Sequence, residues 1–216
     1  MTARWTPRTG ARALVLVLAT GMLLGVGACS KSSNHATNNI QPAADHFRLS
    51  NITGVTPSLQ FNMTDSNGKK VTAVNYRGKY VLLYFGYTHC PDVCPTTVAR
   101  MAQALQELGH LANRVQVLFV SVDPTRDTTK VLREYTHNFG PHIVGLRGTS
   151  AQTQIMANRY HVTYGLGKRD KDGNYVVAHS SAIYIFDPNG KARLLARATD
   201  PAASISHDLR MLMGGA

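Results

Sequence analysis

Two cysteines separated by three residues are the part of this chain best suited to chemistry. Cys90 and Cys94 lie in the run Cys-Pro-Asp-Val-Cys-Pro, directly after an apolar segment and directly before a segment with helical periodicity. Two thiolates on one short loop can exchange a disulfide with another protein or chelate one soft metal ion. An inert structural disulfide is the alternative, but a bridge across so short a loop removes little entropy from the unfolded chain. The pair therefore predicts metal binding or redox exchange.

The elements around the cysteines must set their chemistry. The apolar run 80–85 predicts a buried strand, and Pro95 fits the first position of a following helix, where its missing N–H costs nothing. Because a proline disfavours the helical conformation in the residue before it, we expect Cys94 near the helix N-cap. The positive end of the helix dipole would then stabilise the Cys94 thiolate and lower its pKa below about 8.5. The three-residue spacing favours two sulfurs that open around a metal.

A distant histidine offers a third ligand. His179 precedes the apolar segment 182–186, which predicts a core strand, so the histidine is expected at the mouth of that strand. Soft thiolates select Cu(I), while imidazole suits copper and zinc alike. The alternative is a strand-end histidine with satisfied hydrogen bonds and no metal. His89 competes for the ligand role, but strand alternation directs it away from Cys90, and we expect it beside the site.

The remaining pattern predicts an α/β domain with a mixed sheet. Strands alternate with helices in the first part of the domain, and the end of the chain reads as an antiparallel hairpin around the turn 187–190. The continuous apolar run 115–122 is typical of a central strand covered on both faces. Further strands are expected at 80–86, 143–146, 175–177, 182–186 and 192–196, with helices at 95–109, 128–139 and 150–160 and after residue 201.

The N-terminal region predicts export and a membrane tether. Residues 1–28 combine arginines, a short apolar run and small residues before Cys29, which is the plan of a secretory signal. A cysteine at the cleavage point resembles a bacterial lipobox, which implies cleavage before Cys29 and diacylglyceryl attachment to its sulfur. An uncleaved anchor is the alternative, although about 15 apolar residues are short for a span of about 20. Residues 29–45 predict a flexible linker, and residues 46–216 the folded domain.

Charge excludes one class of partner. The formal net charge is +11, yet the basic residues are scattered and do not form a patch with interleaved aromatic residues. Such a distribution argues against nucleic-acid binding.

Several segments together resemble the Sco/SenC family. They are the cysteine run 85–95, the segment Ser-Val-Asp-Pro-Thr-Arg-Asp-Thr at 121–128, the segment 144–148 and the late His179 before an apolar strand. The resemblance extends from about residue 47 to the last helix. A thioredoxin-type redox motif has two residues between its cysteines, whereas this motif has three. The resemblance implies a thioredoxin-like α/β fold, with a mixed central sheet flanked by helices and an inserted β-hairpin.

The resemblance also implies a function. Cys90, Cys94 and His179 become ligands of copper, as Cu(I) or also as Cu(II), in a membrane-tethered protein that delivers copper to, or prepares, the copper centre of cytochrome c oxidase. The implied partners are the copper-bearing oxidase subunit and other copper chaperones, and the implied location is the cell membrane, with the lipid-anchored domain facing the periplasm or another extracytoplasmic side. The alternative is a thiol:disulfide oxidoreductase that reduces the oxidase cysteines, in which Cys90 attacks and Cys94 resolves. A peroxidase-like thiol enzyme ranks below both.

Two positions near the motifs need separate treatment. Many family members carry an acidic residue immediately before the histidine, where this chain has Ala178. A carboxylate there would orient the imidazole and raise its basicity, so copper affinity or release is expected to differ. Asp123 matches the family segment and could tune the site electrostatically or contact a partner. A simple turn-forming role beside Pro124 is the alternative.

Overall fold

The computed structural model describes residues 46–214. The predicted signal 1–28, the lipid attachment at Cys29 and the linker 29–45 lie outside the described residues, so export and tethering stay predictions. Among residues 46–214, no helix has both the length and the apolar character that a membrane span needs.

An eight-stranded mixed sheet forms the core, with strand order β1-β10-β9-β4-β5-β6-β2-β3. The three parallel strands in its middle are β4 (Tyr80–Gly86), β5 (Val115–Ser121) and β6 (Ile143–Arg147). All seven residues of β4 are buried, as expected for an apolar strand covered on both faces. The remaining strands pair antiparallel: β1 (Ser50–Asn51), β2 (Asn62–Asp65), β3 (Lys70–Thr72), β9 (Ile183–Phe186) and β10 (Ala192–Ala196).

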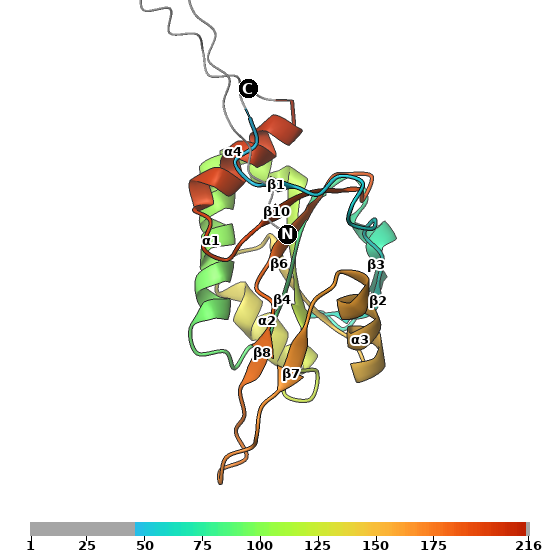
Figure 1. Ribbon diagram of the computed structural model, residues 1–216, viewed down its shortest axis with the longest axis vertical. Coiled ribbons are helices and arrows are strands. Elements are labelled where there is room, and N and C mark those ends of the chain that lie inside the picture. Colours follow the sequence, from blue (N-terminus) through green and yellow to red (C-terminus); the bar gives the residue numbers. More distant parts are fainter. Residues whose placement is uncertain (1–45, 215–216) are drawn as a thin grey trace, which may run out of the picture. The chain divides into compact units, whose positions relative to one another are not determined.

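Helices cover both faces of this sheet (Figure 1). The helices α1 (Val93–Leu108), α2 (Thr129–His137) and α4 (Ala202–Leu212) lie on one face, and α3 (Ser150–Arg159) lies on the other. The crossovers through α1 and α2 step in the same direction across the sheet, so right-handed connections place both helices on the same face. Two short 3-10 helices complete the pattern, η1 (Ala73–Tyr76) and η2 (Gly109–Arg114). The predicted thioredoxin-like α/β class is confirmed.

Local capping chemistry sets where two helices begin. Thr128 caps α2 by accepting a hydrogen bond from the backbone N–H of Val131, so the helix begins one residue after the expected position 128. Thr149 caps α3 and forms a reciprocal capping box with Gln152, so that helix begins at Ser150 as expected.

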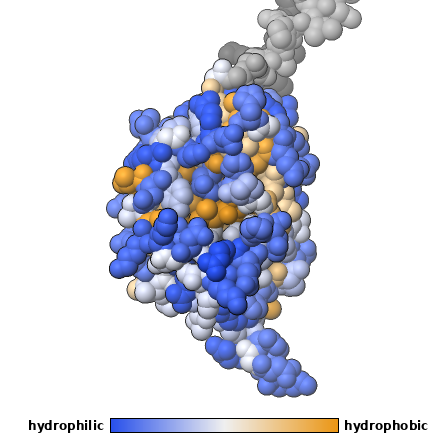
Figure 2. All heavy atoms as spheres, turned by 180° about the vertical axis from the view of Figure 1, so that it is seen from behind, coloured by the Kyte–Doolittle hydropathy of each residue, from blue (hydrophilic) through white to orange (hydrophobic). Residues whose placement is uncertain are grey.

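A second, two-stranded sheet projects from one end of the domain (Figure 1). It consists of β7 (Tyr164–Leu166) and β8 (Val177–His179), which pair antiparallel. Its tip is hydrophilic, as Figure 2 shows at the lower end of the molecule, and residues 167–174 are all exposed. We call residues 164–179 the histidine hairpin. The strand expected at 175–177 lies two residues too early, since β8 begins at Val177 and His179 is its last residue.

Candidate metal centre

The two cysteines lie where β4 gives way to α1. The N-cap of α1 is Asp92, so Cys94 is the second residue inside the helix and Pro95 is the third. Cys94 therefore lies near the N-cap, as expected, but it is inside the helix, and Pro95 is not the first helical residue as predicted. A proline in the first turn finds no carbonyl four residues earlier in the helix to clash with, and the complete burial of Cys94 favours its helical position.

The pKa values of the two thiols are shifted in opposite directions. Burial raises the pKa of Cys94 to about 12, although hydrogen bonding to Tyr87 acts against it. Burial also acts to raise the pKa of Cys90, but donors that include the backbone N–H groups of Cys94 and Asp92 outweigh it, and the net pKa of Cys90 is lowered. The Cys94 N–H lies 3.4 Å from Cys90 Sγ. The helix N-terminus thus stabilises a thiolate as expected, but at Cys90 and not at Cys94.

His179 comes to the cysteines from the histidine hairpin. Its Nε2 lies 3.2 Å from Cys94 Sγ, and its Nδ1 lies 3.0 Å from the carbonyl oxygen of Ser180. When Nδ1 donates its proton to that carbonyl, the lone pair of Nε2 is directed toward the sulfur. Partial burial lowers the pKa of His179, which keeps the imidazole neutral at pH 7.

Aromatic rings enclose the imidazole. Tyr84 and Tyr87 both meet the His179 ring edge-on, with ring centroids 6.1 Å and 5.9 Å away. Tyr84 and Tyr87 themselves are almost completely buried, so water is excluded from that side of the histidine. The sequence assigned neither tyrosine a role, because Tyr84 belongs to the apolar run 80–85, which reads as ordinary core, and Tyr87 entered only as part of the run 85–95.

The position before the histidine does not face the imidazole as the resemblance suggested. Ala178 is exposed, as strand alternation requires for the residue next to a half-buried His179. The Ser180 carbonyl supplies the hydrogen bond that fixes the imidazole tautomer. The orientation of His179 therefore does not depend on a carboxylate at position 178, because the Ser180 carbonyl already holds the imidazole.

The three ligand atoms form one group that could hold a metal ion. The Sγ atoms of Cys90 and Cys94 and a ring nitrogen of His179 all lie within 4.8 Å of one another. Two thiolates and one imidazole are soft to intermediate donors, and this set suits Cu(I) better than a hard cation such as Mg²⁺. The residues present therefore fit a copper ion.

His89 and Asp123 do not belong to the group of three ligand residues. His89 is exposed, with its Nδ1 3.0 Å from Thr88 Oγ1 and 3.7 Å from a carboxylate oxygen of Asp127. Asp123 is buried and accepts hydrogen bonds from Arg126 Nε at 2.5 Å and from the Tyr175 hydroxyl at 2.8 Å. Asp123 thus does more than form a turn, since it bonds to the histidine hairpin.

Sequence reasoning missed a buried carboxylate under the cysteine segment. Asp127 is fully buried and accepts hydrogen bonds from the hydroxyls of Thr88 and Ser121, each at 2.6 Å. The only sequence signal for this role was the family-like segment 121–128, because hydrophobic periodicity carries no information on a buried acid.

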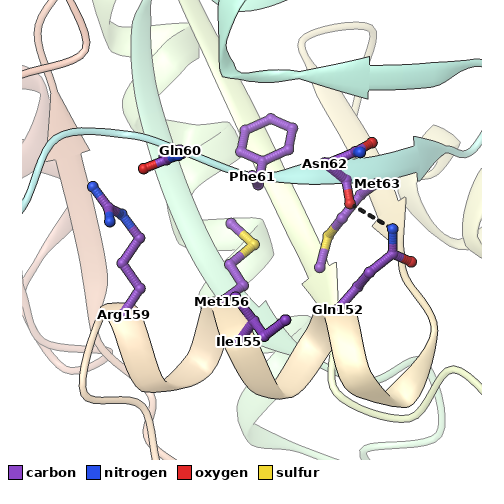
Figure 3. A pocket seen from close by; sticks show the side chains of 8 residues that line it. All are labelled: Gln60, Phe61, Asn62, Met63, Gln152, Ile155, Met156 and Arg159. Carbon is purple, nitrogen blue, oxygen red and sulfur yellow. Dashed lines mark hydrogen bonds between the residues drawn. The ribbon is translucent and has the colours of Figure 1, made fainter.

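A separate cavity of about 460 Å³ lies between β2 and α3, near the opposite face of the sheet (Figure 3). Met63 and Met156 contribute thioethers to its walls, and Gln152 bonds across to the backbone of Asn62 at 3.0 Å. Its lining residues include no thiol, imidazole or carboxylate. The cavity is therefore distinct from the group of three ligand atoms.

Comparisons with known proteins agree on one family. The sequence matches the SCO1/SenC family over residues 52–214. It is 39% identical over 132 residues to the mitochondrial SCO2 homologue of Bos taurus, covering 60% of this chain and 50% of that protein. The chain thus spans about half the length of the curated relatives it matches.

Two solved structures with copper bound are also similar. ScoI of Arabidopsis thaliana has a TM-score of 0.68 and 31% identity, covering 73% of this chain and 98% of that one. ScoI of Bradyrhizobium japonicum has a TM-score of 0.66 and 36% identity, covering 72% of this chain and 98% of that one.

Proposed function

The chain belongs to the SCO1/SenC family, and from this premise we propose that it binds copper and serves the assembly of the copper centre of cytochrome c oxidase. In this function Cys90 and Cys94 bind one copper ion as thiolates, and His179 binds it through Nε2. The observation that carries the proposal is the convergence of these three ligand atoms within 4.8 Å. The copper in two structures that are at least 31% identical to this chain supports the choice of metal.

The residues of the chain prepare this site for a soft cation. His179 is neutral at pH 7 because burial lowers its pKa, so it needs no deprotonation before binding. Cys94 must lose a proton, because burial raises its pKa to about 12. A bound cation offsets that cost by placing positive charge beside the buried sulfur. Copper delivery to the oxidase subunit, or to other copper chaperones, would follow by ligand exchange.

A Cu(I) titration under reducing conditions tests the proposal. The wild-type protein should bind one equivalent, and His179→Ala should bind much more weakly. His89→Ala is the matched control, because this neighbouring histidine lies outside the ligand group, and it should bind as the wild type does. A reduced wild-type protein that takes up no copper at one equivalent would overturn the proposed function.

The membrane tether is part of the same proposal. The signal plan of residues 1–28 supports cleavage before Cys29 and lipid attachment to its sulfur, with residues 29–45 as the linker to the extracytoplasmic domain. Cys29→Ala should then release the protein from the membrane fraction of an expressing bacterium. Retention of that variant in the membrane would favour an uncleaved anchor.

A second function, thiol–disulfide exchange, is favoured by the opposite shifts of the two thiol pKa values. The half-exposed Cys90 thiolate would attack a disulfide of the target, breaking its S–S bond and releasing one target thiolate, which takes up a proton. Cys94 would then give up its proton and attack Cys90 Sγ, which releases the second target thiol. The target gains two electrons, and this chain ends with a Cys90–Cys94 disulfide.

Trapping separates exchange from copper binding. Cys94→Ser should accumulate a mixed disulfide through Cys90 with the oxidase copper-bearing subunit, while Cys90→Ser should not. His179→Ala should exchange at the wild-type rate, because the redox steps use no third ligand. If Cys94→Ser forms no such adduct with an oxidised subunit, the proposal of thiol–disulfide exchange fails. The proposal of copper binding does not depend on this result.

A further inference from the structure

One turn at the end of β5 contacts both segments that carry the proposed copper ligands. It comprises residues 123–127, and two of its carboxylates, those of Asp123 and Asp127, are almost completely buried. We propose that this turn positions the two halves of the site: Asp127 holds the cysteine segment, and Asp123 with Arg126 holds the histidine hairpin. The consequence for copper affinity rests on the proposed function, whereas the positioning itself does not.

The cysteine half is held through Thr88, two residues before Cys90. Asp127 accepts a hydrogen bond from the Thr88 hydroxyl at 2.6 Å, and both of its oxygens lie 3.2–3.3 Å from the Thr88 backbone nitrogen. The same carboxylate accepts a bond from the Ser121 hydroxyl at 2.6 Å, which fixes it to the last residue of β5. Hydrogen bonds to a buried carboxylate are among the stronger ones in proteins, so this link restrains the cysteine segment.

The histidine half is held through Tyr175, four residues before His179. The Tyr175 hydroxyl donates to Asp123 at 2.8 Å, and the other oxygen of Asp123 accepts from Arg126 Nε at 2.5 Å. The Arg126 guanidinium carbon lies 3.6 Å from the centre of the Tyr175 ring. We call Asp123, Arg126 and Tyr175 the hairpin latch, because they join the hairpin to the turn that follows β5.

The hairpin needs such a link. Its two strands form a sheet of their own and do not pair with the eight-stranded sheet. An isolated two-stranded hairpin is marginally stable at best, so side-chain contacts must fix its position against the domain. Within residues 46–214, Arg126 Nη2 is buried without a hydrogen-bond partner, and the rings of Tyr87 and Tyr175 near its guanidinium attract its charge. A residue that merely formed a turn beside Pro124 would not require this arrangement.

The latch residues are therefore positioning residues for His179. They do not touch the ligand atoms, but they set where the end of β8 lies relative to Cys94. Outer-shell partners of this kind typically change metal affinity about 10–100-fold. The two carboxylates of the turn should act differently, since Asp123 acts through His179 and Asp127 acts through the cysteines.

A double-mutant cycle on Cu(I) affinity, measured by competition with a chelator, tests this division. Asp123→Asn and Tyr175→Phe should each weaken binding about 10-fold in the wild-type background. Neither should weaken it further in the His179→Ala background, because the ligand that they position is already absent. Asp127→Asn should weaken binding in both backgrounds. Equal losses from Asp123→Asn with and without His179 would overturn the latch.

A metal-independent measurement decides the latch separately from the proposed function. In the copper-free protein, amide hydrogen exchange across residues 164–179 should be faster in Tyr175→Phe than in wild type. Tyr80→Phe is the matched control, since it also removes one partly buried hydrogen bond of a tyrosine hydroxyl, here to the carbonyl oxygen of Leu212. This variant should leave hydrogen exchange in the hairpin unchanged. Unaltered exchange in Tyr175→Phe would overturn the latch. A wild type that binds no copper would instead overturn the proposed function, and the exchange result would still stand.

Discussion

The cysteine segment and the histidine hairpin contribute to one site but are built differently. The cysteine segment joins β4 to α1, and β4 is buried along its whole length and paired on both edges. The hairpin forms a separate sheet and exposes apolar side chains such as Leu166 and Val176. Segments with few buried contacts open at a lower free energy than core strands. Two of the three ligands therefore belong to the core of the fold, whereas the third is carried by the separate hairpin sheet.

Replacing a core-held ligand should have the largest effect. Cys94→Ser should abolish stoichiometric Cu(I) binding, because a hard hydroxyl replaces a soft thiolate, and the loss should exceed the roughly 100-fold typical of outer-shell changes. Competition titration against a Cu(I) chelator measures it. Cys94→Ala serves as a second variant, since it leaves no hydroxyl in the buried position. Wild-type affinity in both variants would contradict the assignment.

The hairpin ligand should matter for copper but little for folding. His179→Ala should weaken Cu(I) binding by more than the roughly 100-fold that bounds outer-shell changes, yet lower the free energy of unfolding by less than about 1 kcal/mol. Leu118→Ala in β5 should instead cost about 2–5 kcal/mol, because it opens a cavity in a fully buried strand. Urea unfolding of the two copper-free variants compares the regions. A His179→Ala protein as unstable as Leu118→Ala would show that the hairpin is part of the core.

Copper affinity should rise with pH. Between pH 7 and 9 the Cys94 thiol is protonated in the free protein, because its pKa is about 12, and is deprotonated in the complex. At least this one proton is released on binding, so the apparent affinity should rise at least about tenfold per pH unit over this window. At acid pH, protonation of His179 adds a second competing proton and steepens the dependence. A pH-independent affinity between pH 7 and 9 would show that Cys94 is not a ligand.

The smallest effect is expected far from both halves. Thr149→Ala removes the capping box of α3, on the opposite face of the sheet, and should lower the free energy of unfolding by about 1 kcal/mol. Copper affinity should stay at the wild-type value, and Thr149→Ser should retain the stability. A Thr149→Ala variant with weakened copper binding would mean that the site responds to general loss of stability, which would blur the contrast between core and hairpin.

The sequence predicted the central strands of the sheet well, because β4, β5 and β9 are apolar runs, but it gave no range for the short edge strand β1. It placed Cys94 outside the helical conformation, since the preference of a residue before proline is a local rule that burial in the tertiary structure overrode. It also could not foresee that Tyr175 bonds to Asp123, a contact between residues 52 positions apart. Neither periodicity nor propensity contains that information. The convergence of His179 with the cysteines was expected from the family resemblance, and the geometry places the three together.

X-ray absorption at the copper edge, on the reduced protein loaded with one equivalent of Cu(I), identifies the atoms that bind the metal. We expect a coordination of two sulfur ligands and one nitrogen ligand in the wild type, and of two sulfur ligands without that nitrogen in His179→Ala. A spectrum with no sulfur ligands, or one in which His179→Ala retains the same nitrogen contribution as the wild type, would contradict it.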